Sequence, residues 1–192
     1  MHRIGALFCG IVLLMASLAA APVICAVQAK TADPWIARTT KVPFEPRRAA
    51  EAPVQVDFPK KDWMVLPSSG STLLLLASRK GDAVVLVERT VLLQALEPAD
   101  ITDLFAQLEI EGIKVREPKA ADFQSRVLDD GQRRLVAVEY GRSGVLGSER
   151  VRQYSMPIGK RLYHVTCISS AAQFGAYDPV FSHIAASFTA TE

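Results

Sequence analysis

The sequence contains no asparagine, and it is poor in the residues that carry thiol and metal chemistry. Without asparagine there is no acceptor for N-linked glycosylation. Of three cysteines and three histidines, only Cys167, His164 and His183 lie beyond residue 29. One thiol excludes an internal disulfide in that part of the chain. Two histidines exclude a zinc site built from several histidines.

The common signatures of catalytic sites are also missing. There is no C-x-x-C, H-E-x-x-H or G-x-S-x-G motif. The run GRSGVLG has glycines three apart, which matches neither a dinucleotide-binding fingerprint nor a phosphate loop. The pair Asp129–Asp130 before Gly131 is typical of a turn. We therefore expect no cofactor, no metal and no catalytic residue.

The net charge is small and unevenly distributed. The chain has 22 basic and 20 acidic residues, a formal charge of +2, which gives no bulk attraction to nucleic acid. The stretch Asp82–Asp130 holds eleven acidic and five basic residues, whereas Gly131–Glu192 holds seven basic and four acidic ones.

The first 29 residues have the composition of a signal peptide. They begin with a basic pair, carry no charge from Ile4 to Val27 and end in the small-x-small sequence VQA. We predict cleavage after Ala29 and export to the periplasm or the extracellular space. Two alternatives stay open: an uncut membrane anchor, because 24 uncharged residues can span a bilayer, and lipidation at Cys25.

A proline-rich segment follows the leader. Residues 30–53 contain four prolines, scattered charge and no apolar period, which favours an extended, semi-rigid tether. Trp35 and Phe44 are the residues of this segment suited to dock on a domain. We expect a single domain over residues 54–192.

Apolar runs separated by short turns predict strands in that domain. TLLLLAS and AVVLVER flank a glycine-containing turn and predict a hairpin. Both runs are apolar on both faces, so we expect cover on both sides of the sheet. The predicted strands are Val54–Phe58, Asp62–Leu66, Thr72–Ser78, Ala83–Arg89, Arg133–Arg142, Ser148–Met156 and Leu162–Ser169.

Two segments have helical periodicity. Apolar residues at spacings of 0, 3, 4 and 7 predict a helix between a cap at Asp100 and an end at Gly112. A second helix should begin at an Asp178 cap, with Pro179 in the first position. The apolar faces comprise Ile101, Leu104, Phe105 and Leu108 in the first helix, and Phe181, Ile184, Ala185 and Phe188 in the second.

The resulting order is roughly ββββ–α–ββββ–α. Short turns join most strands, and such turns connect antiparallel neighbours. The fold class that the sequence predicts is α+β: an antiparallel β-sheet with helices on both faces, an α-β-α sandwich.

Three segments resemble the PsbP-like superfamily: FPKKDWMV near the start of the domain, GKRLYHVTCIS as its last strand and FGAYDPVFSHIAASF as its final helix. The resemblance covers Val54–Phe188. It implies the α-β-α fold, and a non-catalytic binding or assembly role like that of the photosystem II accessory protein and the Ran-binding import factor. The residues that hold metals in the photosystem protein have no counterpart here.

A thiol–imidazole site in the last strand and helix does not fit the expected geometry. His164 and Cys167 differ by three positions, so a regular strand points them to opposite faces. We interpret Cys167 as a small buried hydrophobe. His183 lies five residues after Asp178, too far for a helical pair, and we interpret it as a partly exposed structural residue.

Basic residues gather in two adjacent hairpins. Charge of this kind usually lies on a solvated strand face, and the alternative is a patch for an anionic partner. In that alternative, Arg150 and Arg152 would face solvent and could be changed without unfolding the protein. The candidate patch consists of Arg133, Arg134, Arg142, Arg150, Arg152, Lys160 and Arg161.

The function that these features favour is an exported, non-catalytic accessory or binding module of the cell envelope, with another envelope protein as its partner. Nucleic acid is not expected to bind. Contact with a membrane would come only through an uncut leader or a lipid on Cys25. The alternative is a small envelope enzyme of the hydrolase type, whose site the sequence does not reveal.

Overall fold

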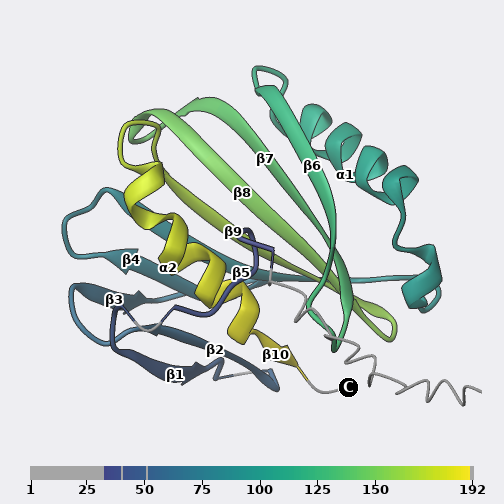
Figure 1. Cartoon of the computed structure of the whole chain (residues 1–192), viewed down its shortest axis with the longest axis horizontal. Helices are drawn as coiled ribbons and strands as arrows, with labels where there is room; N and C mark the ends of the chain where they lie inside the picture. Colours follow the sequence, from purple (N-terminus) through teal and green to yellow (C-terminus); the bar gives the residue numbers. More distant parts are fainter. Residues whose placement is uncertain (1–32, 40, 51, 191–192) are drawn as a thin grey trace, which may run out of the picture. The chain divides into compact units, whose positions relative to one another are not determined.

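A seven-stranded antiparallel sheet dominates the computed structural model, which describes residues 33–39, 41–50 and 52–190 (Figure 1). Its strand order is β3-β4-β5-β9-β8-β7-β6, and a smaller sheet has the order β1-β2-β10. The predicted signal peptide lies outside the described residues. The elements are β1 (Phe44–Arg48), β2 (Val54–Pro59), β3 (Trp63–Leu66), β4 (Thr72–Ser78), β5 (Ala83–Val91), the 3-10 turn η1 (Pro98–Asp100), α1 (Asp103–Arg116), β6 (Ala121–Asp129), β7 (Arg134–Gly144), β8 (Gly147–Ile158), β9 (Arg161–Ser170), α2 (Phe174–Ser187) and β10 (Thr189–Ala190).

The element order agrees with the predicted one. Strands β2 to β5 precede α1, and strands β6 to β9 lie between α1 and α2. Neighbouring strands of both sheets are antiparallel. The fold is therefore mixed α+β, with antiparallel sheets and two helices in the described part of the chain. Three strands were not among the predicted ranges: β6, β1 and β10. The last two both pair with β2 and make it the centre of the second sheet.

The described part of the predicted tether is packed into the fold. Strand β1 lies within residues 30–53, and Trp35 and Ile36 are only 8% and 4% exposed. Pro46 is compatible with β1 because an edge strand leaves one row of backbone N–H groups unpaired. The folded unit thus begins before Val54, where composition placed the boundary.

Helix α2 packs against β2 of the smaller sheet and β9 of the larger one. Its predicted apolar face is confirmed: Phe181, Ile184 and Ala185 are fully buried. Its predicted start is wrong, because the helix begins at Phe174 and contains Pro179 in its interior. Asp178 is therefore not the cap, and its carboxylate binds a buried arginine instead.

Helix α1 packs against the sheet through a face different from the predicted one. It begins at Asp103, capped by Thr102, and buries Ala106, Ile110 and Ile113. Leu104 and Leu108 are 71% and 62% exposed, so their assignment to the buried face was wrong. No helix among the described residues is long and apolar enough to cross a membrane.

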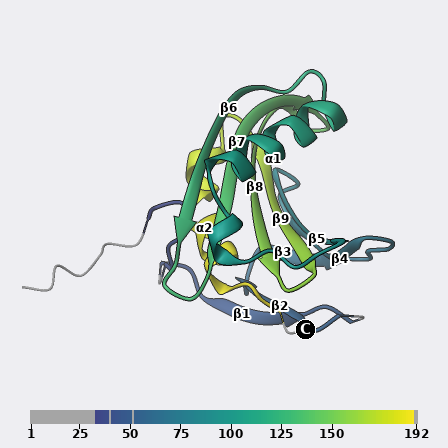
Figure 2. The ribbon, with the colours of Figure 1, turned by 90° about the vertical axis from the view of Figure 1, so that its right-hand side faces the viewer.

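One face of the sheet is only partly covered. Helix α1 lies along β6 and β7, away from β3 and β4 at the opposite edge (Figure 2). In β5, Val85 and Val87 are fully buried, whereas Val84 and Leu86 on the other face are half-buried. The predicted cover on both sides is thus complete on one side only, and the other side retains a hollow.

Two substitutions distinguish the inner from the outer side of α1. We expect Ile113→Ala to lower the free energy of unfolding by about 2–5 kcal/mol, because it leaves a cavity against the sheet. Leu108→Ala should cost less than about 0.5 kcal/mol, because its side chain is exposed. Urea unfolding of both variants measures the difference. A larger loss for Leu108→Ala would contradict the observed orientation of the helix.

Candidate functional site

The last strand and helix do not assemble a thiol–imidazole pair. Cys167 is fully buried and packs with the core under α2, whereas His164 faces Glu109 of α1. Burial raises the pKa of the Cys167 thiol, which therefore stays protonated and unreactive. The interpretation of Cys167 as a buried hydrophobe is confirmed.

His183 is more buried than expected, at 7% exposure. Its ring stacks on Phe44 at 3.6 Å between centroids, and its Nδ1 accepts a hydrogen bond from the backbone N–H of Thr39 at 2.9 Å. Burial lowers its pKa, although Asp57, 3.7 Å from Nε2, acts in the opposite direction. The neutral ring therefore fastens the N-terminal segment to α2.

The seven basic residues of the predicted patch do not share one surface. Arg142 is paired with Glu117 at 2.6 Å and with Glu149 at 2.7 Å, on the side of the sheet that holds α1. Burial would lower the pKa of Arg142, but these two carboxylates raise it above its ordinary value. The charge of Arg142 is thus neutralised within the chain.

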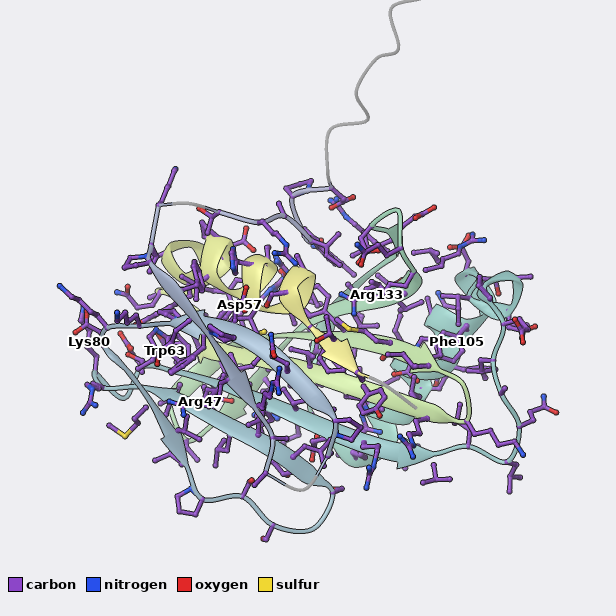
Figure 3. All side chains as sticks on the ribbon, turned by 90° about the horizontal axis from the view of Figure 1, so that it is seen from below. Arg47, Asp57, Trp63, Lys80, Phe105 and Arg133 are labelled. Carbon is purple, nitrogen blue, oxygen red and sulfur yellow. The ribbon has the colours of Figure 1, made fainter. Side chains whose placement is uncertain are left out.

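The Arg133 side chain binds the C-terminal end of α2 (Figure 3). Its guanidinium donates to the backbone carbonyls of Phe188 at 2.7 Å and Ala185 at 2.9 Å, and it pairs with Asp130 at 2.9 Å. A guanidinium at this position adds donors to the carbonyls at the C-terminal end of the helix. Arg133 is therefore committed to structure.

Arg150 and Arg152 share one carboxylate. Glu139 accepts from Arg150 at 2.7 Å through Oε1 and from Arg152 at 2.6 Å through Oε2. Arg152 also binds Asp178 and is only 3% exposed. The expectation that both arginines face solvent is therefore wrong for Arg152. Three patch residues are left: Arg134 and Lys160 are exposed, and Arg161 is half-buried.

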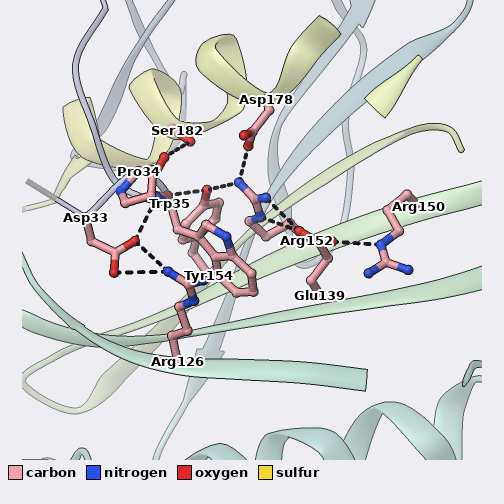
Figure 4. Close-up of polar contacts among 10 residues, drawn as sticks. All are labelled: Asp33, Pro34, Trp35, Arg126, Glu139, Arg150, Arg152, Tyr154, Asp178 and Ser182. Atoms are coloured by element: carbon pink, nitrogen blue, oxygen red, sulfur yellow. Dashed lines mark hydrogen bonds and ion pairs between the residues drawn. The ribbon is translucent and has the colours of Figure 1, made fainter. Parts of the chain in front are cut away.

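An aromatic ring separates Arg152 from a second arginine (Figure 4). The guanidinium carbons of Arg152 and Arg126 each lie 4.5 Å from the ring centroid of Trp35. Arg126 also contacts the carboxylate of Asp33 at 3.3 Å. Cation–π attraction of this kind is strongest for tryptophan and for partly desolvated cations.

Backbone contacts hold the same segment in place. The Tyr154 hydroxyl donates to the Trp35 carbonyl at 2.6 Å, and the Ser182 hydroxyl donates to the Pro34 carbonyl at 2.9 Å (Figure 4). These donors come from β8 and α2, so the N-terminal segment joins the sheet to the helix. We call residues 33–36 with these contacts the N-terminal clamp.

A polar cavity of about 320 Å³ occupies the partly covered face of the sheet. Two arginines and two glutamates line it, together with hydroxyl, amide and imidazole groups from β5, β8 and β9. Polar groups that converge in a hollow are the usual mark of a binding site. The lining residues are Ser71, Leu86, Glu88, Thr90, Arg116, Glu117, Tyr140, Arg142, Gln153, His164, Thr166 and Ile168.

A carboxylate from α1 lies beside this cavity. Glu109 Oε2 accepts from the Ser155 hydroxyl at 2.5 Å and from Gln153 Nε2 at 3.0 Å. His164 Nε2 lies 3.2 Å from the same oxygen, but the two groups are not aligned for a hydrogen bond. Burial would raise the pKa of Glu109, yet His164, Ser155 and Arg116 together hold it below its ordinary value.

Sequence reasoning missed this cavity. Its floor includes Gln153 on β8 and three alternate residues of the adjacent strand β9, His164, Thr166 and Ile168. Polar residues at every second position could have marked a polar face. The contribution of Glu109 had no such signal, because it depends on how α1 lies on the sheet.

Comparison with known proteins identifies the fold. No protein-family model and no curated protein matches the chain. Cyanobacterial PsbP (CyanoP) from Synechocystis matches with a TM-score of 0.59 and 10% identity, over 83% of this chain and 100% of that chain. LpqN from Mycobacterium tuberculosis, described as involved in cell envelope biogenesis, matches with a TM-score of 0.51 and 15% identity, over 79% and 92%. The chain has a PsbP-like fold. The predicted resemblance is thereby confirmed for the fold.

Arg152 should be essential to this PsbP-like fold. We expect Arg152→Gln to lower the free energy of unfolding by about 3–5 kcal/mol, because Glu139 would stay buried without its main partner. Arg134→Gln, at an exposed position of the same patch, should change it by less than about 0.5 kcal/mol. Thermal and urea unfolding of both variants provide the measurement. Equal stability of the two would show that the buried pair contributes nothing.

Proposed function

We propose that the protein is an exported, non-catalytic accessory or binding module of the cell envelope, and that the polar cavity between α1 and the sheet is its binding site. Another envelope protein is the proposed partner. The proposal joins three features: the fold, the leader and the chemistry of the cavity.

The chemistry of the cavity carries the proposal. Ser155 is the hydroxyl in contact with Glu109, and it is fully buried, out of reach of a substrate. A carboxylate with a lowered pKa is also a weak base at neutral pH. Ser155 and Glu109 thus stabilise each other, and the polar groups that line the cavity beside them are suited to binding rather than to bond cleavage.

The arrangement of the helices supports a sandwich with the cavity on one side. Along β7, Leu135 and Ala137 pack into the cluster that contains α2, whereas Val136 and Val138 pack into the cluster that contains α1. Successive residues of a strand point to opposite faces. We therefore propose an α-β-α sandwich in which α1 covers its own face incompletely and leaves the cavity open.

The cellular context rests on the leader and on the fold. Residues 1–29 have the charge pattern of an export signal. LpqN, which shares the fold, is described as involved in cell envelope biogenesis. Both features favour a role outside the cytoplasm, in the periplasm or beyond.

A hydrolase is the second candidate, because Glu109, Ser155 and His164 lie close together. In that case Glu109 would be the base and the buried Ser155 would have to become accessible. The two candidates differ in what a cavity variant loses: a binding module loses a partner, whereas an enzyme loses turnover.

Cross-linked capture from envelope extract tests the proposal. We compare wild type with Arg116→Gln, which removes an exposed charge from the cavity wall, and with Lys119→Gln, an exposed residue outside it. One component should be captured by wild type and by Lys119→Gln. Its capture by Arg116→Gln should fall at least about fivefold, which corresponds to roughly 1 kcal/mol of contact energy.

Two results would contradict this function. Equal capture by all three proteins would show that the cavity is not the binding site. Hydrolysis of model esters or amides by wild type, abolished in Glu109→Gln, would identify an enzyme instead.

A further inference from the structure

Helix α1 is apolar on two opposite sides. Its inner side buries Ala106, Ile110 and Ile113 against the sheet. Phe105 is partly buried against the same cluster, whereas three further apolar residues are exposed: Leu104 by 71%, Leu108 by 62% and Val115 by 81%. We call these three exposed residues the outer row.

The spacing places the outer row opposite the sheet. Leu104 stands two positions before Ala106, and Leu108 stands two positions before Ile110. Two positions correspond to about 200° around an α-helix, so each pair lies on opposite sides of the axis. From Leu104 to Val115 the row extends about 16 Å, or three turns.

A helix with two apolar sides is expected to bury both. Single apolar residues are common on protein surfaces and need no explanation, but an aligned row of large ones marks an interaction site. A row of this length matches one face of a three-turn helix, which can dock along it as helices do in apolar grooves.

The charge beside the outer row selects the kind of helix. The acidic residues Asp100, Asp103 and Glu111 are exposed on η1 and α1. Lys114 pairs with Glu111 at 2.8 Å and neutralises it, so the net negative charge of this surface comes from Asp100 and Asp103 at the start of the helix. The surface is therefore apolar and acidic, and it complements a helix that carries leucine-like residues beside lysine or arginine.

We propose that the outer row of α1 is the docking site for a cationic amphipathic helix of another protein. The site goes beyond the proposed cavity function, because its residues do not line the cavity. An anionic membrane surface fits less well, since the acidic residues would be repelled by its headgroups. A second copy of α1 would bring the same acidic residues together.

Two synthetic peptides test the proposal. Both form a four-turn amphipathic helix with leucine on one face; one carries lysine on the other face and one carries glutamate. Fluorescence anisotropy of the labelled peptides, measured with the full protein at low and moderate salt, gives the affinities. The lysine peptide should bind at least about tenfold more tightly than the glutamate peptide, and more weakly as salt rises.

Variants locate the binding on the helix. The double variant Leu104→Gln, Leu108→Gln should bind the lysine peptide at least about tenfold more weakly than wild type does. Its unfolding midpoint should not change, because glutamine retains helix propensity. Val145→Gln is the matched control, since Val145 is 101% exposed on the turn between β7 and β8. The cavity variant Arg116→Gln removes a positive charge next to Val115 and should bind the lysine peptide at least as tightly as wild type does, which separates this site from the cavity.

Several outcomes would overturn the proposal. These are equal affinity of wild type and the double variant, failure of wild type to bind the lysine peptide, and a preference for the glutamate peptide. Binding to anionic phospholipid vesicles in place of the peptide, lost in the double variant, would assign the outer row to a membrane surface instead. A dimer that sedimentation detects for wild type but not for the double variant would assign it to a second copy of the chain.

Discussion

Arg152 enters the interior of the protein from the middle of β8, and its charge has to be neutralised there. A guanidinium that is 3% exposed is costly unless carboxylates and hydrogen-bond acceptors surround it. Glu139 on β7 and Asp178 on α2 provide the carboxylates, and Trp35 provides an aromatic face. Burial would lower the pKa of Arg152, but these acidic groups and Tyr154 raise it, so the charge is retained.

This one side chain ties together parts of the chain that are distant in sequence. Glu139 and Asp178, which bind Arg152, lie 13 and 26 residues from it in the sequence. The Trp35 carbonyl accepts a hydrogen bond from the hydroxyl of Tyr154, which is 119 residues away. Sheet, helix and N-terminal clamp therefore depend on the same buried charge. Where α1 packs on the sheet, the described residues form no such clamp, and a cavity stays open beside β5, β8 and β9.

Part of this structure could be predicted from local patterns. Short turns between apolar runs indicated antiparallel neighbours and the order of elements along the chain, and a period of two placed His164 and Cys167 on opposite faces. These features depend on neighbours in the sequence. The buried face of α1 could not be predicted, because apolar residues occur on both sides of the helix and periodicity alone does not choose between Leu108 and Ile110.

The clamp could not be predicted for a different reason. Arginines in a basic stretch resemble solvated surface, and only long-range contacts show that Arg152 is buried. Prolines suggested an extended, semi-rigid tether over residues 30–53. Trp35 and Phe44 were expected to be suited to docking, but the partners of Trp35 lie far along the chain and could not be named from the sequence. The polar cavity was missed because Glu109 joins it through the packing of α1. Local chemistry thus indicated the fold class, and tertiary contacts determined the site.

The central claim is that residues 33–36 are clamped to the sheet through the stacking of Trp35 between Arg126 and Arg152. Proton NMR of the protein tests it most directly, because an aromatic ring shifts protons that lie over its face. The account predicts that the side-chain methylene protons of both arginines are shifted upfield and show nuclear Overhauser contacts to the Trp35 indole. Unshifted arginine resonances, with sharp, random-coil signals for residues 33–36, would show that this segment is a free tether and would contradict the account.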